Sequence, residues 1–453
     1  MMQSFIIFGA TGDLTGRFLL PAFAHLIQAD KLPAAPTIMG VGREPWNQAE
    51  FRRHAEEQLA VHSEADPQVH RRLLDCLDYQ KADVTDPQEV GAVMAKIDGP
   101  VIAYLALPAG LFAPVIRAVA AGAKEGTRIV IEKPFGENLE SARALNRLLH
   151  ESFSETAIFR MDHFLGMRTV QNLLGLRFAN RLFEPVWSCE HISRVEILWD
   201  ETLGLEGRAS YYDRAGALRD MVQNHLLQLL CYVGMEPPLT LDARDVRSRK
   251  VDVLRAVRSM TMEEVDVHTV RARYGAGRID DRVIPAYVDE EGIDPERGTE
   301  TFAKVVLHID NWRWAGVPFV LRTGKMLARD RQEMIVHFKP VPHLAFGSET
   351  SVRHNRLRMQ FNPDRIDLHL NVTGADELFS LHETALEKQL ARQTIPAYGQ
   401  VLLDVIQGDQ TLSIRDDETE ESWRIVQPIL DAWAQGRSPL REYAAGSEGP
   451  VNG

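Results

Sequence analysis

The chain has 453 residues, 45% of them hydrophobic and 25% charged, with a formal net charge of −13 at pH 7. This composition is typical of a globular protein with a large core, and the length predicts two or three domains. The acidic balance argues against nucleic acid or an anionic membrane surface as a general partner.

The sequence also lacks several localisation and metal signals. No stretch reaches the roughly 18 apolar residues that a membrane helix needs, and no signal peptide precedes the first apolar run. The three cysteines, Cys76, Cys189 and Cys231, have no metal-binding spacing and are expected to be reduced thiols. We therefore expect a cytoplasmic protein without a metal site.

Apolar runs and helical patterns alternate over the first third of the chain. This alternation predicts a parallel, doubly wound, Rossmann-like sheet in a dinucleotide-binding domain at 1–158. Strands are expected at 4–8, 36–41, 100–107 and 128–131, and helices at 19–28, 50–59, 67–77, 111–121 and 141–152.

The remainder of the chain is dominated by period-two alternation. Such runs, separated by polar turns, predict a large, mostly antiparallel sheet covered by helices, in a substrate and oligomerisation domain of α+β type at 159–453. Strands are expected at 193–200, 302–309, 317–323, 333–338, 356–361 and 365–372, and helices at 211–234 and 381–394.

A glycine motif follows the first expected strand. Side chains at Gly9 and Gly12 would block the approach of a pyrophosphate, and the helix after the turn offers amide donors. A strand, a glycine turn and a helix together indicate a dinucleotide site, although a plain tight turn is the alternative. The expected cofactor-binding residues of this turn are Gly9, Thr11, Gly12, Asp13 and Leu14.

Two charged residues, Arg43 and Glu44, follow the second expected strand. In this fold the adenosine ribose lies there; an arginine favours the 2′-phosphate of NADP, and a carboxylate favours NAD. The pair favours NADP, with NAD possible, and a solvated charge pair is the alternative.

Two segments combine acids with histidines: Asp162-His163, after a short apolar run, and a helical stretch carrying Asp220 and His225. A histidine titrates near working pH, and an acid can orient it as a base. Beside a dinucleotide, these groups indicate a hydride-transfer site. A lone histidine in an apolar helix is more often a core residue.

Several long blocks, in the right order, resemble the glucose-6-phosphate dehydrogenase family nearly end to end. They are FGATGDL from Phe8, IEKPFGENL from Ile131, FRMDHFLG from Phe159, VQNLLGLRFANRLFEPVW from Val170, GRASYYDRAGALRDMVQNHLLQ from Gly207, IDNWRWAGVPFVLRTGK from Ile309 and LLDVIQGDQTLSIRDDE from Leu402.

The resemblance implies an enzyme that oxidises the C1 hydroxyl of a hexopyranose to its lactone with NADP. His225 would be the general base, and Asp162 would orient it. The remaining residues that it implies are His163, Glu201, Asp220, Lys325 and Lys133 for the sugar substrate, and Lys133 with Pro134, across a bond that can be cis, for the cofactor. A homodimer or homotetramer is also implied.

The chain departs from the family pattern at the end that would hold the substrate phosphate. The family's tyrosine and lysine after the histidine are Phe164 and Met167, and two further basic positions are Phe18 and Asp330. Two lost hydrogen bonds to a charged group, each worth roughly 1.5–3 kcal/mol, would weaken binding substantially. Phe164 and Met167 are kept as substrate-side residues. One alternative is a relative acting on a non-phosphorylated or otherwise modified sugar, and another is an inactive nucleotide- or sugar-binding regulator.

Overall fold

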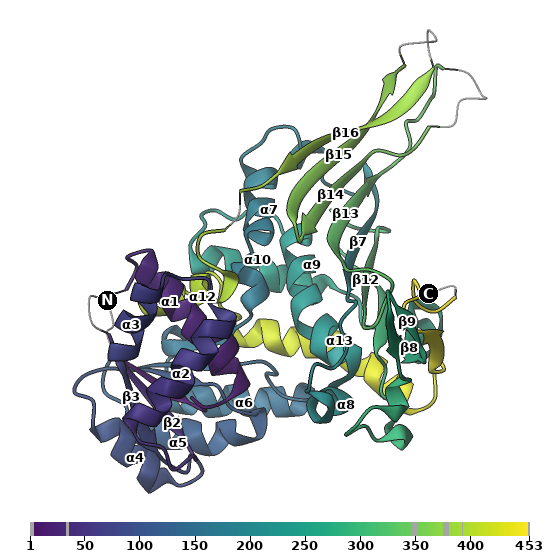
Figure 1. Cartoon of the computed structure of the whole chain (residues 1–453). Helices are drawn as coiled ribbons and strands as arrows, with labels where there is room; N and C mark the ends of the chain where they lie inside the picture. The colour runs from purple at the N-terminus through teal and green to yellow at the C-terminus, as the bar shows by residue number, and fades with distance from the viewer. Residues whose placement is uncertain (1–3, 33–35, 347–351, 375–379, 392, 452–453) are drawn as a thin grey trace. The chain divides into compact units, whose positions relative to one another are not determined.

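The computed structural model describes residues 4–32, 36–346, 352–374, 380–391 and 393–451. The chain forms two compact units (Figure 1). The first comprises Met1–Met167, Pro238–Ser248 and Gln393–Glu420, and the second comprises Arg168–Pro237, Arg249–Arg392 and Glu421–Gly453.

The first unit contains a six-stranded parallel sheet in the order β3-β2-β1-β4-β5-β6. This is the strand order of a doubly wound dinucleotide-binding fold, so the predicted fold class is confirmed. The short apolar runs are buried because helices cover them. The strands are β1 (Ser4–Phe8), β2 (Thr37–Gly42), β3 (Leu77–Lys81), β4 (Ile102–Leu105), β5 (Arg128–Glu132) and β6 (Ile158–Met161).

The helices of this unit pack in two groups, one in which α1 contacts α2 and α3 and one in which α5 contacts α4 and α6. A helix from late in the sequence, α12 (Ala397–Gln407), also packs against α1. The other helices are α1 (Leu20–Gln28), α2 (Gln48–His62), α3 (Pro67–Asp75), α4 (Pro87–Ala95), α5 (Phe112–Gly122) and α6 (Leu139–Ser152).

The second unit is built on a nine-stranded mixed sheet in the order β16-β15-β14-β13-β7-β12-β11-β8-β17. Most neighbours are antiparallel, as predicted, but β12 pairs parallel with β7, and β17 with β8. Its strands are β7 (Ile192–Asp200), β8 (Thr269–Gly275), β11 (Phe302–His308), β12 (Pro318–Gly324), β13 (Arg331–Phe338), β14 (Arg356–Phe361), β15 (Asp364–Thr373), β16 (Leu381–Gln389) and β17 (Arg441–Ala444), beside a small hairpin of β9 (Gly277–Ile279) and β10 (Arg282–Ile284).

Helices cover the sheet of the second unit in part through a central helical run, α8, η6 and α9, in which η6 contacts β11 and β12. Further contacts come from α7, which meets β14 and β15, and from α11, which meets β8 and β11. The remaining bounds are α7 (Arg168–Phe178), α8 (Ala209–Ala217), η6 (Leu218–Leu226), α9 (Leu227–Gly234), α10 (Ala243–Ala256), α11 (Met262–His268) and α13 (Asp416–Ala434).

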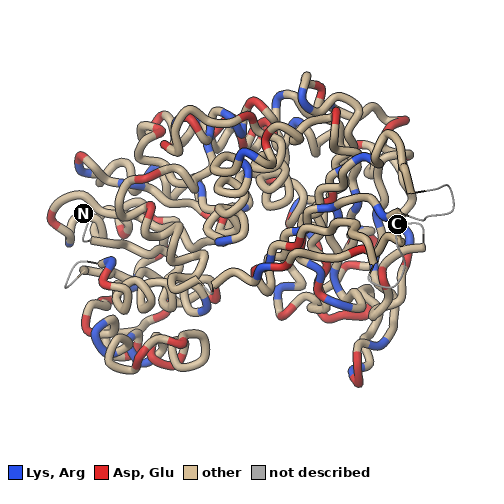
Figure 2. The backbone as a smooth tube through the Cα atoms, turned by 90° about the horizontal axis from the view of Figure 1, so that it is seen from above, with Lys and Arg blue, Asp and Glu red and all other residues tan. Residues whose placement is uncertain are grey.

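Acidic and basic positions are intermingled along the chain in both units (Figure 2). In the large sheet they form ion pairs across neighbouring strands. Asp200 on β7 lies 3.0 Å from Arg322 on β12 and 3.3 Å from Arg331 on β13, and Asp367 on β15 lies 3.7 Å from Arg358 on β14. Several acidic side chains of the sheet are therefore neutralised locally by arginines on adjacent strands. Among the described residues, every helix is too short or too polar to cross a membrane.

The expected helix at 381–394 is wrong. Leu381 and Ala385 have helical spacing, but the segment forms β16, which pairs antiparallel with β15 from Thr373↔Leu381 to Arg365↔Gln389. Cross-strand pairing outweighs the local helical preference here, as it does for many surface segments. Residue 392 lies outside the described part of the chain.

Two other expectations need correction. The helix expected at 67–77 ends at Asp75. Leu77 begins strand β3, which pairs with β2 and is not predicted because its sequence, LDYQK, is largely polar. The helix expected at 211–234 is broken at Gly216, where the backbone adopts a φ of +68°.

Candidate active site

The glycine motif forms a tight turn where β1 ends. The Gly9 amide donates to the Val41 carbonyl at 2.9 Å, and the Gly12 amide donates to the Gly9 carbonyl at 3.1 Å. Gly9 has a φ of +87°, and a Cβ there would lie 2.2 Å from the Ala106 carbonyl oxygen. A side chain at position 9 is therefore excluded both by the backbone conformation and by the close approach of the end of β4.

The residues around this turn hold one another in place. Thr11 donates its hydroxyl to the carboxylate of Glu44 at 2.8 Å, and the Tyr79 hydroxyl donates to the Glu44 carbonyl at 2.9 Å. Arg43 is exposed. The Glu44 carboxylate thus already accepts one hydrogen bond from within the turn, and the neighbouring Arg43 is open to solvent.

Asp13 and Leu14 begin the helix after the turn. Asp13 forms an ion pair with Arg17 at 3.5 Å, and Leu14 directly precedes the first helical turn at Thr15. Arg17, on the first turn of this helix, therefore has a carboxylate beside it.

A buried acid that the sequence analysis missed lies at the end of β5. The Glu132 carboxylate accepts a hydrogen bond from the Tyr104 hydroxyl of β4. Burial raises the pKa of Glu132 to about 7, opposed by that hydrogen bond and by the charge of Lys133. The sequence signal for this buried acid is a glutamate at the end of a strand whose preceding residues, Ile129–Ile131, are apolar. The next peptide bond, Lys133–Pro134, is cis.

Asp162 and His163 follow the end of β6. Asp162 is 1% exposed, and its Oδ1 accepts from the Phe164 amide at 3.0 Å, which caps the short η4 helix (His163–Gly166). The His163 ring stacks on Tyr398 of α12, with centroids 4.8 Å apart and planes 14° apart. No local pattern in the sequence points to Tyr398, because only the packing of α12 against η4 brings the two rings together.

The predicted phosphate end of the site is lined with apolar groups in this unit. Phe164 is buried and meets the His163 ring edge-on at 5.0 Å. Phe18 is 37% exposed and stacks on Tyr398, with ring centroids 4.9 Å apart. Met167 is partly buried. His163, Tyr398 and Phe18 thus form a stack of three rings.

In the second unit, Glu201 and Lys325 lie side by side at the ends of β7 and β12. Their strands pair with Asp200 opposite Gly324, and the Glu201 amide donates to the Gly324 carbonyl at 2.9 Å. The Lys325 ammonium then reaches the Glu201 carboxylate at 2.7 Å. It also lies 5.3 Å from the centre of the Tyr212 ring. The structure therefore brings together two of the predicted sugar ligands.

Asp330 and its neighbours are held within the same unit. Asp330 accepts from the Thr202 amide at 2.7 Å and from the Thr202 hydroxyl at 3.0 Å. Arg329 pairs with Glu448 at 3.5 Å, and Arg331 with Asp200. These three side chains therefore attach the segment after β12 to other parts of the second unit.

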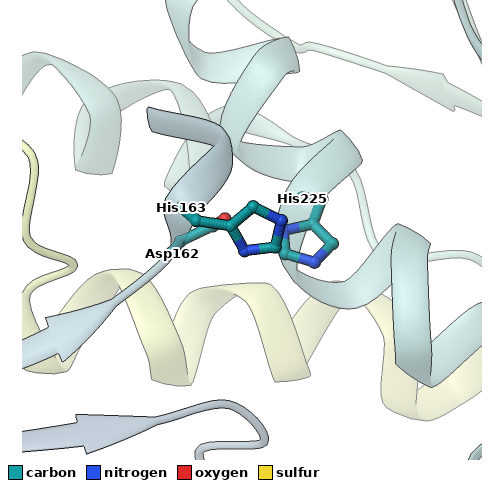
Figure 3. A group of neighbouring side chains, drawn as sticks. All are labelled: Asp162, His163 and His225. Atoms are coloured by element: carbon teal, nitrogen blue, oxygen red, sulfur yellow. The ribbon is translucent and has the colours of Figure 1, made fainter. Parts of the chain in front are cut away.

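His225 and Asp220 lie on the helical run that begins after Gly216. His225 is 1% exposed, and Asp220 accepts a hydrogen bond from the Tyr211 hydroxyl at 3.2 Å. Figure 3 draws His225 on its helix, and Asp162 and His163 at the end of their strand. The expected base is thus buried on a helix, and the expected orienting acid is buried at the cap between β6 and η4.

The fold and these residues define a class of protein: dinucleotide-binding oxidoreductases in which a Rossmann-type unit is followed by an α+β unit. The chain belongs to the glucose-6-phosphate dehydrogenase family. The family model for "Glucose-6-phosphate dehydrogenase, NAD binding domain" matches residues 6–172, and the one for "Glucose-6-phosphate dehydrogenase, C-terminal domain" matches residues 174–453.

Individual relatives match over almost the whole chain. The glucose-6-phosphate 1-dehydrogenase of Mycolicibacterium smegmatis is 40% identical over 99% of this chain and 94% of its own. The enzyme of Bacillus subtilis is 38% identical over 98% of this chain and 94% of its own. A crystal structure of the Mycobacterium avium enzyme has a TM-score of 0.87 at 35% identity, covering 99% of this chain and 96% of that one. A glucose-6-phosphate dehydrogenase in complex with its substrate glucose-6-phosphate also has a TM-score of 0.87, at 30% identity, covering 99% and 96%.

The raised pKa of Glu132 predicts a pH-dependent stability. Between about pH 4.5 and about 7 the unfolded chain loses the proton while the folded protein keeps it, so native stability falls as pH rises through this window and is constant above it. Glu132→Gln cannot ionise and avoids this loss. The free energy of unfolding of Glu132→Gln, relative to that of the wild type, should therefore increase by a few kcal/mol between pH 5 and pH 8. Urea titration at each pH measures this difference. Glu151→Gln, at an exposed site on α6, is the control. A constant difference between Glu132→Gln and wild type across this range would contradict the prediction.

Proposed function

We propose that the chain is a glucose-6-phosphate 1-dehydrogenase, which oxidises the C1 hydroxyl of glucose 6-phosphate to the lactone with NADP. The observation that carries the proposal is the match over 99% of the chain to a family structure that holds glucose 6-phosphate, together with the presence here of Asp162, His225, Glu201 and Lys325.

His225 acts as the general base on the C1 hydroxyl, because hydride leaves more easily from a carbon whose oxygen is losing its proton. Asp162 accepts a hydrogen bond from the other ring nitrogen of His225, which fixes the tautomer and stabilises the imidazolium that forms. The burial of both groups supports these roles, since an ion pair formed away from water is stronger. Bound NADP supplies the nicotinamide that accepts the hydride.

The sugar hydroxyls are bound by Glu201, Asp220 and Lys325, and Lys133 lies between the sugar and the cofactor. The Lys325–Glu201 ion pair supports this assignment, because it offers a donor and an acceptor side by side. At the other end of the sugar, His163 binds the phosphate, and Phe164 and Met167 line the pocket.

The two alternatives, a modified sugar and an inactive regulator, have less support. Relatives near 40% identity over nearly the full length are glucose-6-phosphate 1-dehydrogenases. The retention of Asp162 and His225 argues against a silent regulator, because an inactive relative has no use for a buried base and its acid.

Further features concern the cofactor, the assembly and the compartment. Gly9, Thr11, Gly12, Asp13 and Leu14 cradle the pyrophosphate, with Lys133 and Pro134 near the nicotinamide. We propose that the enzyme is a homodimer or homotetramer and that it is cytoplasmic. The free cysteines fit a reducing compartment. The exposed apolar side chains of Val372 and Leu386 on the outer strands of the large sheet fit a subunit contact.

Replacing His225 by Asn should lower kcat by about 10²–10⁴-fold, because the imidazole that takes the proton is lost. The dissociation constant for NADP should be almost unchanged. Steady-state assays of NADPH formation and a fluorescence titration with NADP give the two values. His62→Asn, at an exposed position on α2, is the control. An unaltered kcat in His225→Asn would remove His225 from this role.

Replacing Arg43 by Ala should weaken NADP binding more than NAD binding, because only NADP carries the 2′-phosphate. The loss of one charge-assisted contact corresponds to about 1.5–3 kcal/mol, or roughly one to two decades in the dissociation constant for NADP. Calorimetric titration with each cofactor measures the ratio, and Arg53→Ala, another exposed arginine, is the control. Equal losses for both cofactors would show that Glu44 sets the preference instead.

Phe164→Tyr combined with Met167→Lys should lower KM for glucose 6-phosphate by about tenfold or more, because both new groups can donate to the phosphate. The ratio of kcat/KM for glucose 6-phosphate to that for glucose should rise with it. Phe164→Tyr combined with Met167→Gln adds comparable volume without the charge and serves as the control. An unchanged KM in the lysine variant would show that the phosphate lies elsewhere.

A further inference from the structure

Three consecutive buried polar residues, Thr299, Glu300 and Thr301, lie just before β11. Buried polar side chains are stable only when they are hydrogen-bonded. In this segment each of the three residues bonds to a different part of the second unit. The partners include the helix that carries His225 and the turn that carries Lys325.

Glu300 caps the start of the His225 helix. The Ala217 amide donates to the Glu300 carbonyl oxygen at 3.1 Å, and the Leu218 amide donates to its side-chain Oε1 at 3.0 Å. The first amides of a helix have no partner within the helix. One residue, 6% exposed, therefore satisfies two of them and fixes where this helix begins.

Gly216, just before the capped end of the helix, leaves room for the Glu300 side chain. Gly216 has a φ of +68°, and a Cβ there would lie 2.4 Å from the Glu300 Oε1. The chain therefore breaks between α8 and η6 beside the glutamate side chain, and Asp220 and His225 follow on the next turns. A shift at the start of this helix would move both residues together, because a helix behaves as a rigid element over two or three turns.

The two threonines attach the same segment to other parts of the site. Thr299 donates its hydroxyl to the Asp213 carbonyl of α8 at 2.5 Å. The Lys325 amide donates to the Thr301 carbonyl at 3.0 Å, and Tyr443, bonded to the Thr301 hydroxyl at 2.9 Å, donates to the Lys325 carbonyl at 2.6 Å. The turn bearing Lys325 is thus held on both sides.

We propose, on the basis of the function given above, that Glu300 is a positioning residue of the reaction. Through its two hydrogen bonds it sets the position of the helix carrying Asp220 and His225 against the turn carrying Lys325. The role depends on the reach of the side-chain oxygen. Burial raises the pKa of Glu300, and the hydrogen bond from the Leu218 amide and the charges of Arg219 and Arg271 oppose that rise.

Three variants of Glu300 distinguish the effect of its side-chain length from the effect of its charge. Glu300→Gln keeps an oxygen at the same distance and should keep kcat near that of the wild type. Glu300→Asp keeps the charge but is one methylene shorter, and Glu300→Ala removes the cap. Both should lower kcat by about 10- to 100-fold, because small displacements of catalytic groups have effects of this size. The dissociation constant for NADP should stay unchanged in all three.

The matched control is Thr261→Ala, which removes the capping box at the start of α11 in the same unit. It should lower the melting temperature as the Glu300 variants do, but leave kcat unchanged. Thermal unfolding and circular dichroism confirm that each variant is folded at the assay temperature. If Glu300→Ala does not fold, the comparison of Gln with Asp decides alone.

An unchanged kcat in folded Glu300→Asp would overturn the proposal. Rescue by Asp but not by Gln would overturn it as well, because it would show that charge matters and reach does not. His225→Asn in the same series distinguishes this outcome from a failure of the proposed function. If His225→Asn lowers kcat as predicted while Glu300→Asp does not affect it, only the positioning role fails.

Discussion

The parallel register of the six-stranded sheet decides where the chemistry of the first unit can lie. Because β1, β4, β5 and β6 are neighbours and run in one direction, their carboxyl ends meet at one edge. Gly9, Ala106, Lys133 and Asp162 each follow one of these strand ends. A one-residue slip in any pairing would exchange the two faces of that strand and displace the residue that follows its end. The backbone hydrogen bonds of the sheet therefore determine which of these four residues are neighbours.

Buried carboxyl groups with defined donors recur in both units. Glu132 accepts from the Tyr104 hydroxyl, Asp162 from the Phe164 amide and Glu300 from the Leu218 amide. A buried acid without a donor would be strongly destabilising, so each bond also defines a position. Under the proposed function, groups held in this way before the substrate binds would need little rearrangement during the reaction, which is the basis of electrostatic preorganisation.

The apolar character of the proposed phosphate end is a property of packing as well as of sequence. His163 is stacked on Tyr398, which in turn stacks on Phe18, so packing defines the plane of the His163 ring. Under the proposed function, a phosphate would rely on fewer charged partners than the family pattern offers. Weaker contacts far from C1 raise KM, and they also reduce the binding energy available to orient the reacting carbon.

The sequence by itself determined the doubly wound fold, the glycine turn, most strands of the large sheet and the family, because these depend on local periodicity and on long ordered motifs. It failed where pairing decides: Leu381–Gln389 has helical spacing but is a strand, since β15 offers it a hydrogen-bonding edge. Only the tertiary structure could bring Tyr398 to His163, Tyr104 to Glu132, and Glu300 to Leu218. Each of these contacts joins residues far apart in the chain, and no local pattern encodes which distant group will satisfy a buried hydrogen bond.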